Sequence, residues 1–89
     1  MLEMRFDFST IACRTDFYRC FAAQSGVGDH FGANLDALWD ALTGDIALPA
    51  RIVLCHAPSP DQSGELAAIF DLLEEAQQTL QGALALHYC

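Results

Sequence analysis

The chain contains no lysine, and its four arginines face twelve acidic residues, which gives a formal net charge of −8. Proteins that bind nucleic acid need a basic surface for the phosphate backbone, so this balance excludes direct nucleic-acid binding. An acidic surface instead steers a basic protein partner into contact, and it also keeps a protein soluble. Charge alone therefore excludes one class of function without choosing among the others.

Long apolar runs are also missing, although 53% of the 89 residues are hydrophobic. No stretch of about 18 consecutive apolar residues occurs, which excludes a transmembrane helix. The first residues, Met-Leu-Glu-Met-Arg-Phe-Asp-Phe, lack the basic and apolar regions of a signal peptide. We therefore expect a single domain over residues 1–89 that stays in the cytoplasm and does not bind a membrane.

Four cysteines are present, but none belongs to a Cys-x-x-Cys pair. An even count indicates a disulfide framework in secreted proteins, and nothing in this sequence directs the chain to an oxidising compartment. We therefore predict that all four are buried thiols that pack as small hydrophobic side chains. They are Cys13, Cys20, Cys55 and Cys89.

Motifs for catalysis or metal binding are absent as well. No serine, cysteine or histidine falls in a recognisable nucleophile motif. Cys55 and His56 are adjacent rather than spaced for chelation, and no His-Glu-x-x-His occurs. Asp36 and Asp40 could work as paired carboxylates or hold a divalent ion, but an open helix face offers neither an apolar pocket nor further ligands. We expect no enzymatic activity and no cofactor.

Hydrophobic periodicity predicts three strands separated by helices. Residues 3–8 alternate between polar and apolar side chains, as in a half-buried strand. The apolar run at 52–55 is typical of a buried parallel strand, and residues 83–88 form the last predicted strand. Helices are predicted from an N-cap at Thr15 to Ser25, over 35–43, and over 65–80, with a single turn from Pro60 left open. This order predicts an α/β fold, a small three-stranded parallel sheet covered by three to four helices.

The most informative segment is residues 30–44, which is predicted to be a loop that runs into a helix. Asn34 is the predicted N-cap of this helix, and Gly44 is its predicted C-terminal stop. Three leucines recur at spacings of three and four and form one apolar stripe, namely Leu35, Leu38 and Leu42.

A second face of the same helix carries Asp36, Trp39 and Asp40. Two aspartates four residues apart repel each other by a few tenths of a kcal/mol. Asp40 also lies beyond the first turn, where the helix dipole no longer favours an anion. A local rule broken without structural gain indicates a functional site, and an exposed tryptophan flanked by carboxylates is typical of a protein interface.

Residues 30–44 closely resemble the barstar family, which are intracellular inhibitors of secreted ribonucleases. The resemblance is densest in Phe-Gly at 31–32, Asn-Leu-Asp-Ala-Leu-Trp-Asp at 34–40 and Leu-Thr-Gly at 42–44. It extends more weakly over nearly the whole chain. The resemblance implies a single barstar-like domain, monomeric when free, that forms a one-to-one complex with a basic, guanine-preferring ribonuclease. Blocking the active site would give the producing cell immunity.

The resemblance also implies roles for individual residues. Asp40 would enter the cleft where the RNA phosphate normally lies and accept charge-assisted hydrogen bonds from the nuclease. Glu75 of the long helix best matches a second acidic contact, with Glu74 as the alternative register. The contacts implied in the loop and helix are His30, Phe31, Gly32, Asn34, Leu35, Asp36, Trp39, Asp40, Thr43 and Gly44.

The chain departs from the family pattern just before the helix. His30 stands where the best-known members have a tyrosine, and Gly28 replaces the usual proline. A histidine can become cationic below pH about 6.5, which would weaken contact with a basic nuclease. We expect these two positions to influence which nuclease fits.

An alternative reading from another class is an acidic protein-interaction module. It would use the same helix on a target that is not a nuclease. Rescue of cells from ribonuclease toxicity, lost on replacing Asp40, separates the two readings.

Overall fold

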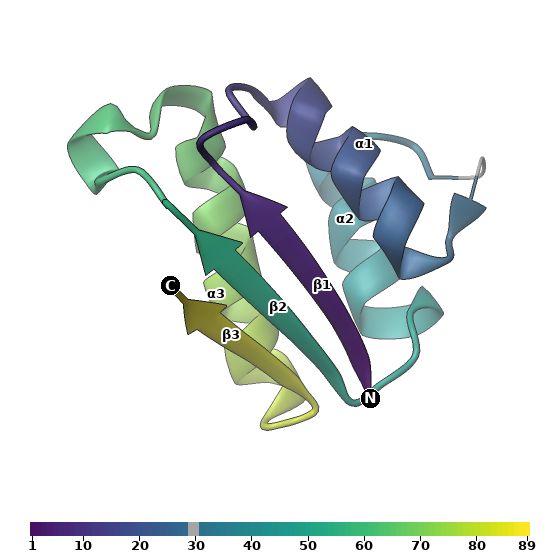
Figure 1. Ribbon diagram of the computed structural model, residues 1–89. Helices are drawn as coiled ribbons and strands as arrows, with labels where there is room; N and C mark the ends of the chain where they lie inside the picture. Colours follow the sequence, from purple (N-terminus) through teal and green to yellow (C-terminus); the bar gives the residue numbers. More distant parts are fainter. Residues whose placement is uncertain (29–30) are drawn as a thin grey trace.

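Three parallel strands form a single sheet in the order β1, β2, β3 (Figure 1). The structure is a computed structural model, and it describes residues 1–28 and 31–89. β1 (Leu2–Asp7) and β3 (Leu84–Tyr88) both pair in parallel with the central strand β2 (Ala50–Cys55). The predicted three-stranded parallel sheet is therefore confirmed.

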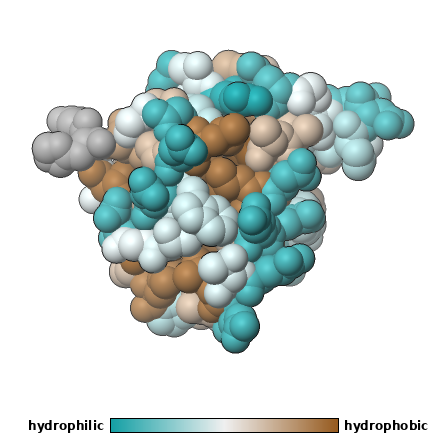
Figure 2. All heavy atoms as spheres, turned by 180° about the vertical axis from the view of Figure 1, so that it is seen from behind, coloured by the Kyte–Doolittle hydropathy of each residue, from teal (hydrophilic) through white to brown (hydrophobic). Residues whose placement is uncertain are grey.

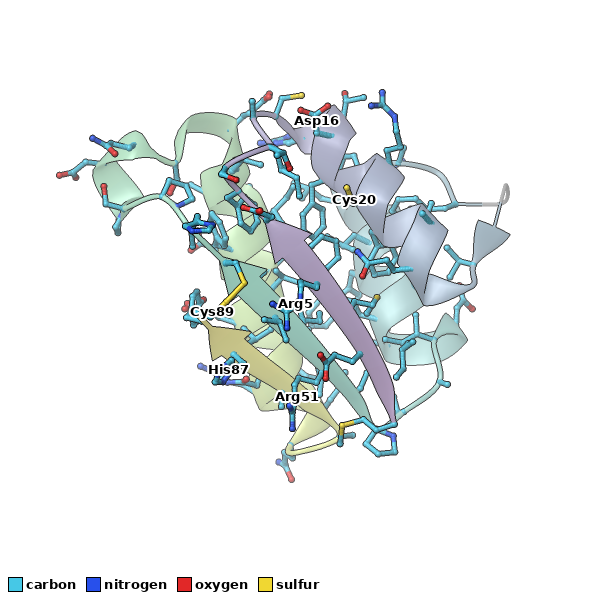
Figure 3. All side chains as sticks on the ribbon, viewed as in Figure 1. Arg5, Asp16, Cys20, Arg51, His87 and Cys89 are labelled. Carbon is cyan, nitrogen blue, oxygen red and sulfur yellow. A yellow bond between two sulfur atoms is a disulfide. The ribbon has the colours of Figure 1, made fainter. Side chains whose placement is uncertain are left out.

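Helices pack behind the sheet and beside its edge strand β1 in the view of Figure 1. In chain order they are α1 (Arg14–Ser25), α2 (Leu35–Asp40), the π-helical η2 (Ala41–Asp45), the 3-10 turns η3 (Pro60–Gln62) and η4 (Gly64–Leu66), and α3 (Ala67–Leu80). The other face of the sheet is open, and Figure 3 shows Arg5, Arg51 and His87 on it. Over 1–28 and 31–89, every helix is too short or too polar to cross a bilayer.

The sequence pattern of each strand matches its place in the sheet. In β1, Met4 and Phe6 are fully buried, whereas Glu3 and Arg5 between them are exposed. This alternation is expected of a strand with helices on one side only. β2 is buried along nearly its whole length because strands flank it on both sides.

The core lies between the sheet and the helices and is rich in phenylalanine. Phe6 of β1 stacks on Phe17 of α1 with ring centroids 4.5 Å apart, and Phe21 continues the stack one turn later. Ile69 and Leu73 of α3 are also fully buried in this cluster. Each such side chain contributes about 1.5–3 kcal/mol on burial, which holds α1 and α3 against the sheet.

Glutamine side chains from the helices cover part of each outer edge of the sheet. The Gln24 amide of α1 accepts from the Arg5 N–H at 2.7 Å and donates to the Arg5 carbonyl at 2.8 Å. On the other edge, the Leu86 N–H donates to Gln77 Oε1 of α3 at 2.6 Å. These amides occupy backbone groups that another strand would otherwise pair with, so they protect both edges against strand addition.

Two predicted helix starts differ from the structure. The N-cap of α1 is Cys13 rather than Thr15, because the Asp16 carboxylate folds back to accept from the Ala12 N–H at 3.2 Å and draws the chain into the helix earlier. The long helix predicted from Glu65 begins with a 3-10 turn and becomes α-helical only at Ala67. Such 3-10 turns are common at helix ends.

The prediction that all four cysteines are buried thiols is wrong, because Cys55 and Cys89 form a disulfide. Leu54 of β2 and Tyr88 of β3 are partners in the parallel register, so the next residue of each strand meets its counterpart at the end of the sheet. The two Cα atoms are 4.7 Å apart. Cys13 and Cys20 are free, and both are half-buried rather than buried.

Asp7, at the end of β1, makes the stability of the fold depend on pH. Hydrogen bonds from the Ser9 hydroxyl and the Ser9 N–H, with a further one from His56, lower the pKa of Asp7 from 3.8 to about 2. A carboxyl whose pKa is lower in the folded state stabilises the fold above its unfolded pKa and loses that effect on protonation. We expect the free energy of unfolding to fall as pH drops from about 4 to about 2, and Asp7→Asn to flatten this fall in urea titrations at each pH. An unchanged pH dependence in the variant would contradict the assignment.

Candidate functional site

The helix that carries the candidate site begins as the sequence predicts. Asn34 has an extended backbone and its Oδ1 accepts from the Ala37 N–H at 2.7 Å, which makes it the N-cap of α2. The Leu38 N–H donates to the Asn34 carbonyl at 2.9 Å and closes the first turn. Because α2 is only six residues long, this cap and its packing together fix where the helix starts.

Replacing this N-cap tests how much it contributes. Asn34→Ala removes the acceptor for the Ala37 N–H, and we expect it to lower the free energy of unfolding by about 1 kcal/mol. Asn34→Ser keeps a capping oxygen and serves as the matched control, with a much smaller expected loss. Urea denaturation of both variants measures the difference. Equal losses in the two variants would show that the cap does not hold the helix.

The prediction that Gly44 stops the helix is wrong. The chain continues through Gly44 as the π-helical segment η2, where the Ile46 N–H donates to the Ala41 carbonyl at 3.0 Å. Within this segment, the Thr43 hydroxyl donates to the Trp39 carbonyl at 2.8 Å. Hydroxyl bonds of this kind compete with the regular backbone ladder of a helix. Single π-helical turns inside helices are frequent at functional sites.

The wider turn changes which acidic residues lie together. Asp40 and Asp45 are five residues apart, and in a regular α-helix they would lie about 140° apart around the axis. Here both line one hollow of 190 Å³, together with Val27, Phe31, Gly32, Ala37 and Ala41. Sequence reasoning missed Asp45, because a helix period of 3.6 residues assigns it to a different face. A spacing of five residues places two side chains on one face only in a π-helical turn, and the sequence does not indicate such a turn here.

The polar face of α2 is as open as predicted at its carboxylates. Asp36, Asp40 and Asp45 are all exposed. Within residues 1–28 and 31–89, the ion pairs are Arg19–Asp16, Arg51–Glu3 and His56–Asp7, so none of them uses a carboxylate of α2 or η2. In the same ranges no three potential ligands gather to hold a metal ion. These carboxylates can therefore accept charge-assisted hydrogen bonds from cations of another molecule.

The apolar side of α2 anchors it to the core. Leu38 and Leu42 are fully buried and Leu35 is half-buried, which confirms the predicted leucine stripe. Trp39 is half-buried and packs against the core, so it is less exposed than the aspartates on either side of it. The helical side as a whole shows hydrophobic surface interleaved with hydrophilic groups (Figure 2). Mixed surfaces of this kind are typical of protein interfaces.

The loop before α2 is also held by the core. The Phe31 ring lies 5.8 Å from that of Tyr18 and 5.1 Å from that of Phe21, so it packs against α1. A Cβ on Gly32 would lie 3.3 Å from the Ala37 Cβ, and this close approach favours glycine there. The predicted contact residue His30 lies outside the residues that the structure describes.

The long helix offers two neighbouring glutamates, and they point in different directions. The Tyr88 hydroxyl donates to Glu74 Oε1 at 3.3 Å, and Gln77 also contacts β3, so both residues lie on the side of α3 that faces β3. A step of about 100° per residue places Glu75 on the side away from β3. α2 packs against α3 and makes no contact of similar extent with β3. This geometry favours Glu75 over Glu74 as a neighbour of the α2 surface.

Comparison with known proteins gives two findings. The family model described as Barstar (barnase inhibitor) matches residues 1–86. The chain is also similar to a Bacillus subtilis (strain 168) protein named "Putative ribonuclease inhibitor YrdF", with 42% identity over 55 residues. That match covers 60% of this chain and 60% of the length of the relative.

Proposed function

Because this chain belongs to the barstar family, we propose that it inhibits a ribonuclease by covering the active site of the enzyme with the acidic face of α2. The observation that carries the proposal is the set of exposed carboxylates on α2 and η2. None of them forms an ion pair with a basic side chain among the described residues. The name of the Bacillus relative supports the same activity.

Asp40 is the centre of the proposed contact. A ribonuclease must hold the RNA phosphate with cationic groups, and a carboxylate in that cleft accepts the same charge-assisted hydrogen bonds. Asp40 is exposed, lies in the middle of the helix–π-turn segment and lines the 190 Å³ hollow. It therefore mimics the phosphate in the proposed complex.

Three other carboxylates contribute to the proposed contact. Asp45 shares the hollow with Asp40, Asp36 lies one turn earlier on α2, and Glu75 extends from α3 on the side away from β3. Each can pair with a basic group at the edge of the nuclease cleft. Together they define an acidic surface that fits a strongly basic enzyme.

The remaining contacts supply shape rather than charge. Gly32 and Asn34 bring backbone and a short polar side chain to the loop edge, while Thr43 and Gly44 close the far side of the surface. Half-buried Phe31, Leu35 and Trp39 expose the rest of their side chains beside the carboxylates. In the proposed complex these groups exclude water around the central charge.

The net charge of −8 contributes to the rate of encounter. A basic, guanine-preferring ribonuclease would be steered toward this protein, and added salt would slow the association. One acidic surface and one active site give a one-to-one complex. Such an inhibitor would act inside the producing cell and give it immunity to the nuclease.

The experiment that tests the proposal is a titration against a panel of secreted guanine-preferring ribonucleases. We expect at least one enzyme to form a one-to-one complex with a dissociation constant below about 1 μM, the range of specific protein complexes. With both proteins well above the dissociation constant, RNA cleavage should stop at one equivalent of inhibitor. Absence of inhibition across the whole panel would contradict the proposal and favour an acidic interaction module with a target that is not a nuclease.

A further inference from the structure

A second groove lies away from α2, between the loop that follows β2 and helix α3. It has a volume of 450 Å³ and is lined by Ala57, Pro58, Pro60, Ser63, Ala67, Phe70, Asp71, Glu74 and Tyr88. In Figure 1 the loop after β2 and the end of β3 lie on the left, whereas α1 and α2 lie on the right. The groove and the acidic surface of α2 therefore belong to different sides of the protein.

The lining of this groove combines apolar and acidic side chains. One wall is formed by prolines and alanines, and the aromatic rings of Phe70 and Tyr88 add further apolar surface. The polar groups on α3 are the carboxylates of Asp71 and Glu74, both exposed. None of the nine lining residues is basic. This lining favours a ligand that carries positive charge and also offers a flat or apolar surface.

The groove is held in shape by its own contacts. The Tyr88 hydroxyl donates to Glu74 Oε1 at 3.3 Å, which joins two lining residues from β3 and α3. Tyr88 is the last residue of β3, and the Cys55–Cys89 disulfide ties the chain to β2 directly after it. On the other wall, the Ser63 hydroxyl donates to the Ser59 carbonyl at 2.8 Å and closes the turn around Pro60.

We propose that this groove binds an arginine side chain presented by a second protein. A guanidinium is planar, stacks on aromatic rings and pairs with carboxylates through two parallel hydrogen bonds. The groove supplies both kinds of partner, the aromatic rings of Phe70 and Tyr88 and the carboxylates of Asp71 and Glu74. The apolar stem of the arginine packs along Pro58 and Pro60. Because α2 is not involved, the protein can hold this partner and a nuclease together.

The test is a ¹H–¹⁵N NMR titration of the full chain with the acetylated and amidated tetrapeptide Arg-Gly-Arg-Gly. We expect saturable shifts at Ala57, Phe70, Glu74 and Tyr88. The double variant Asp71→Asn, Glu74→Gln should weaken binding by about fivefold or more, because two charge pairs are lost. The same peptide with citrulline in place of arginine, which keeps the shape without the charge, should produce no saturable shifts.

The matched control is Glu75→Gln, which removes one charge from the same helix outside the groove. We expect it to leave peptide binding within about twofold, since it changes only distant, screened charge. The proposal is wrong if Glu75→Gln lowers the affinity for the peptide as much as the double variant does. It is also wrong if the peptide shifts resonances across α2, because the peptide would then bind through net charge alone. Nuclease inhibition by the double variant should show only the small, salt-dependent decrease in association rate that follows from lost net charge. Failure of peptide binding can therefore be told apart from failure of the proposed function.

Discussion

Asp40→Ala should weaken inhibition of the ribonuclease more than any other single substitution in this chain. In the proposed complex, several cations of the enzyme active site are buried against this one carboxylate, and truncation leaves them without a partner. Breaking a buried ion pair from one side costs about 3–5 kcal/mol, or roughly a hundred- to a few thousand-fold in the dissociation constant. The measurement is the inhibition constant against the nuclease, at one fixed salt concentration.

The matched control is Asp61→Ala, which removes an exposed aspartate from η3 and changes the net charge by the same amount. Its expected effect is confined to a small, salt-dependent decrease in association rate. If Asp40→Ala and Asp61→Ala weaken inhibition equally, the acidic helix acts only through overall charge. That result would remove Asp40 from the centre of the contact.

Leu38→Ala should have the largest effect on stability among the residues of α2. Leu38 is fully buried beneath the acidic face, so truncation removes apolar contacts and leaves a cavity. Changes of this kind lower the free energy of unfolding by about 2–5 kcal/mol. A domain of this size has only about 5–15 kcal/mol in total, so urea unfolding should shift to clearly lower concentrations.

Leu48→Ala is the control for this second prediction, because Leu48 is 39% exposed and is not part of the core. We expect it to change the free energy of unfolding by less than about 0.5 kcal/mol. The six residues of α2 are too few to form a stable helix alone, so their geometry depends on Leu38 and Leu42. A loss of similar size in both variants would mean that the acidic face is not supported from below.

The sequence predicts most of the fold because its signals are local. Alternation in β1, the apolar run of β2 and the leucine stripe of α2 each follow from the period of one element. Parallel order then follows from helices placed between the strands. The N-cap at Asn34 is equally local, since its amide oxygen needs only the N–H three residues later.

What the sequence does not predict depends on distant contacts or on an unusual turn. Cys55 and Cys89 are 34 residues apart, and only the register of β2 with β3 brings them together. The π-helical turn at Ala41–Asp45 departs from the 3.6-residue period of an α-helix. The sequence pattern therefore does not indicate that Asp45 and Asp40 line the same hollow. The same simple period assigns Trp39 to the exposed face, yet Trp39 is partly buried against the neighbouring core.

The sequence therefore indicates the acidic residues at the centre of the candidate surface but not Asp45 at its edge. Asp36 and Asp40 stand out in the sequence because two like charges on one helix face are unfavourable without a partner. The hydrogen bond between Tyr88 and Glu74, which favours Glu75 as the contact on α3, comes from the packing of β3 and could not be read from the helix alone.

The most direct test of the central claim is competition at the nuclease active site. The protein is titrated into the ribonuclease by calorimetry at rising concentrations of guanosine 3′-monophosphate, which occupies the site where RNA binds. If α2 covers that site, the apparent dissociation constant of the protein should rise in proportion to the nucleotide concentration. An apparent dissociation constant that stays the same at saturating nucleotide would show that the acidic helix binds elsewhere, and it would contradict the account.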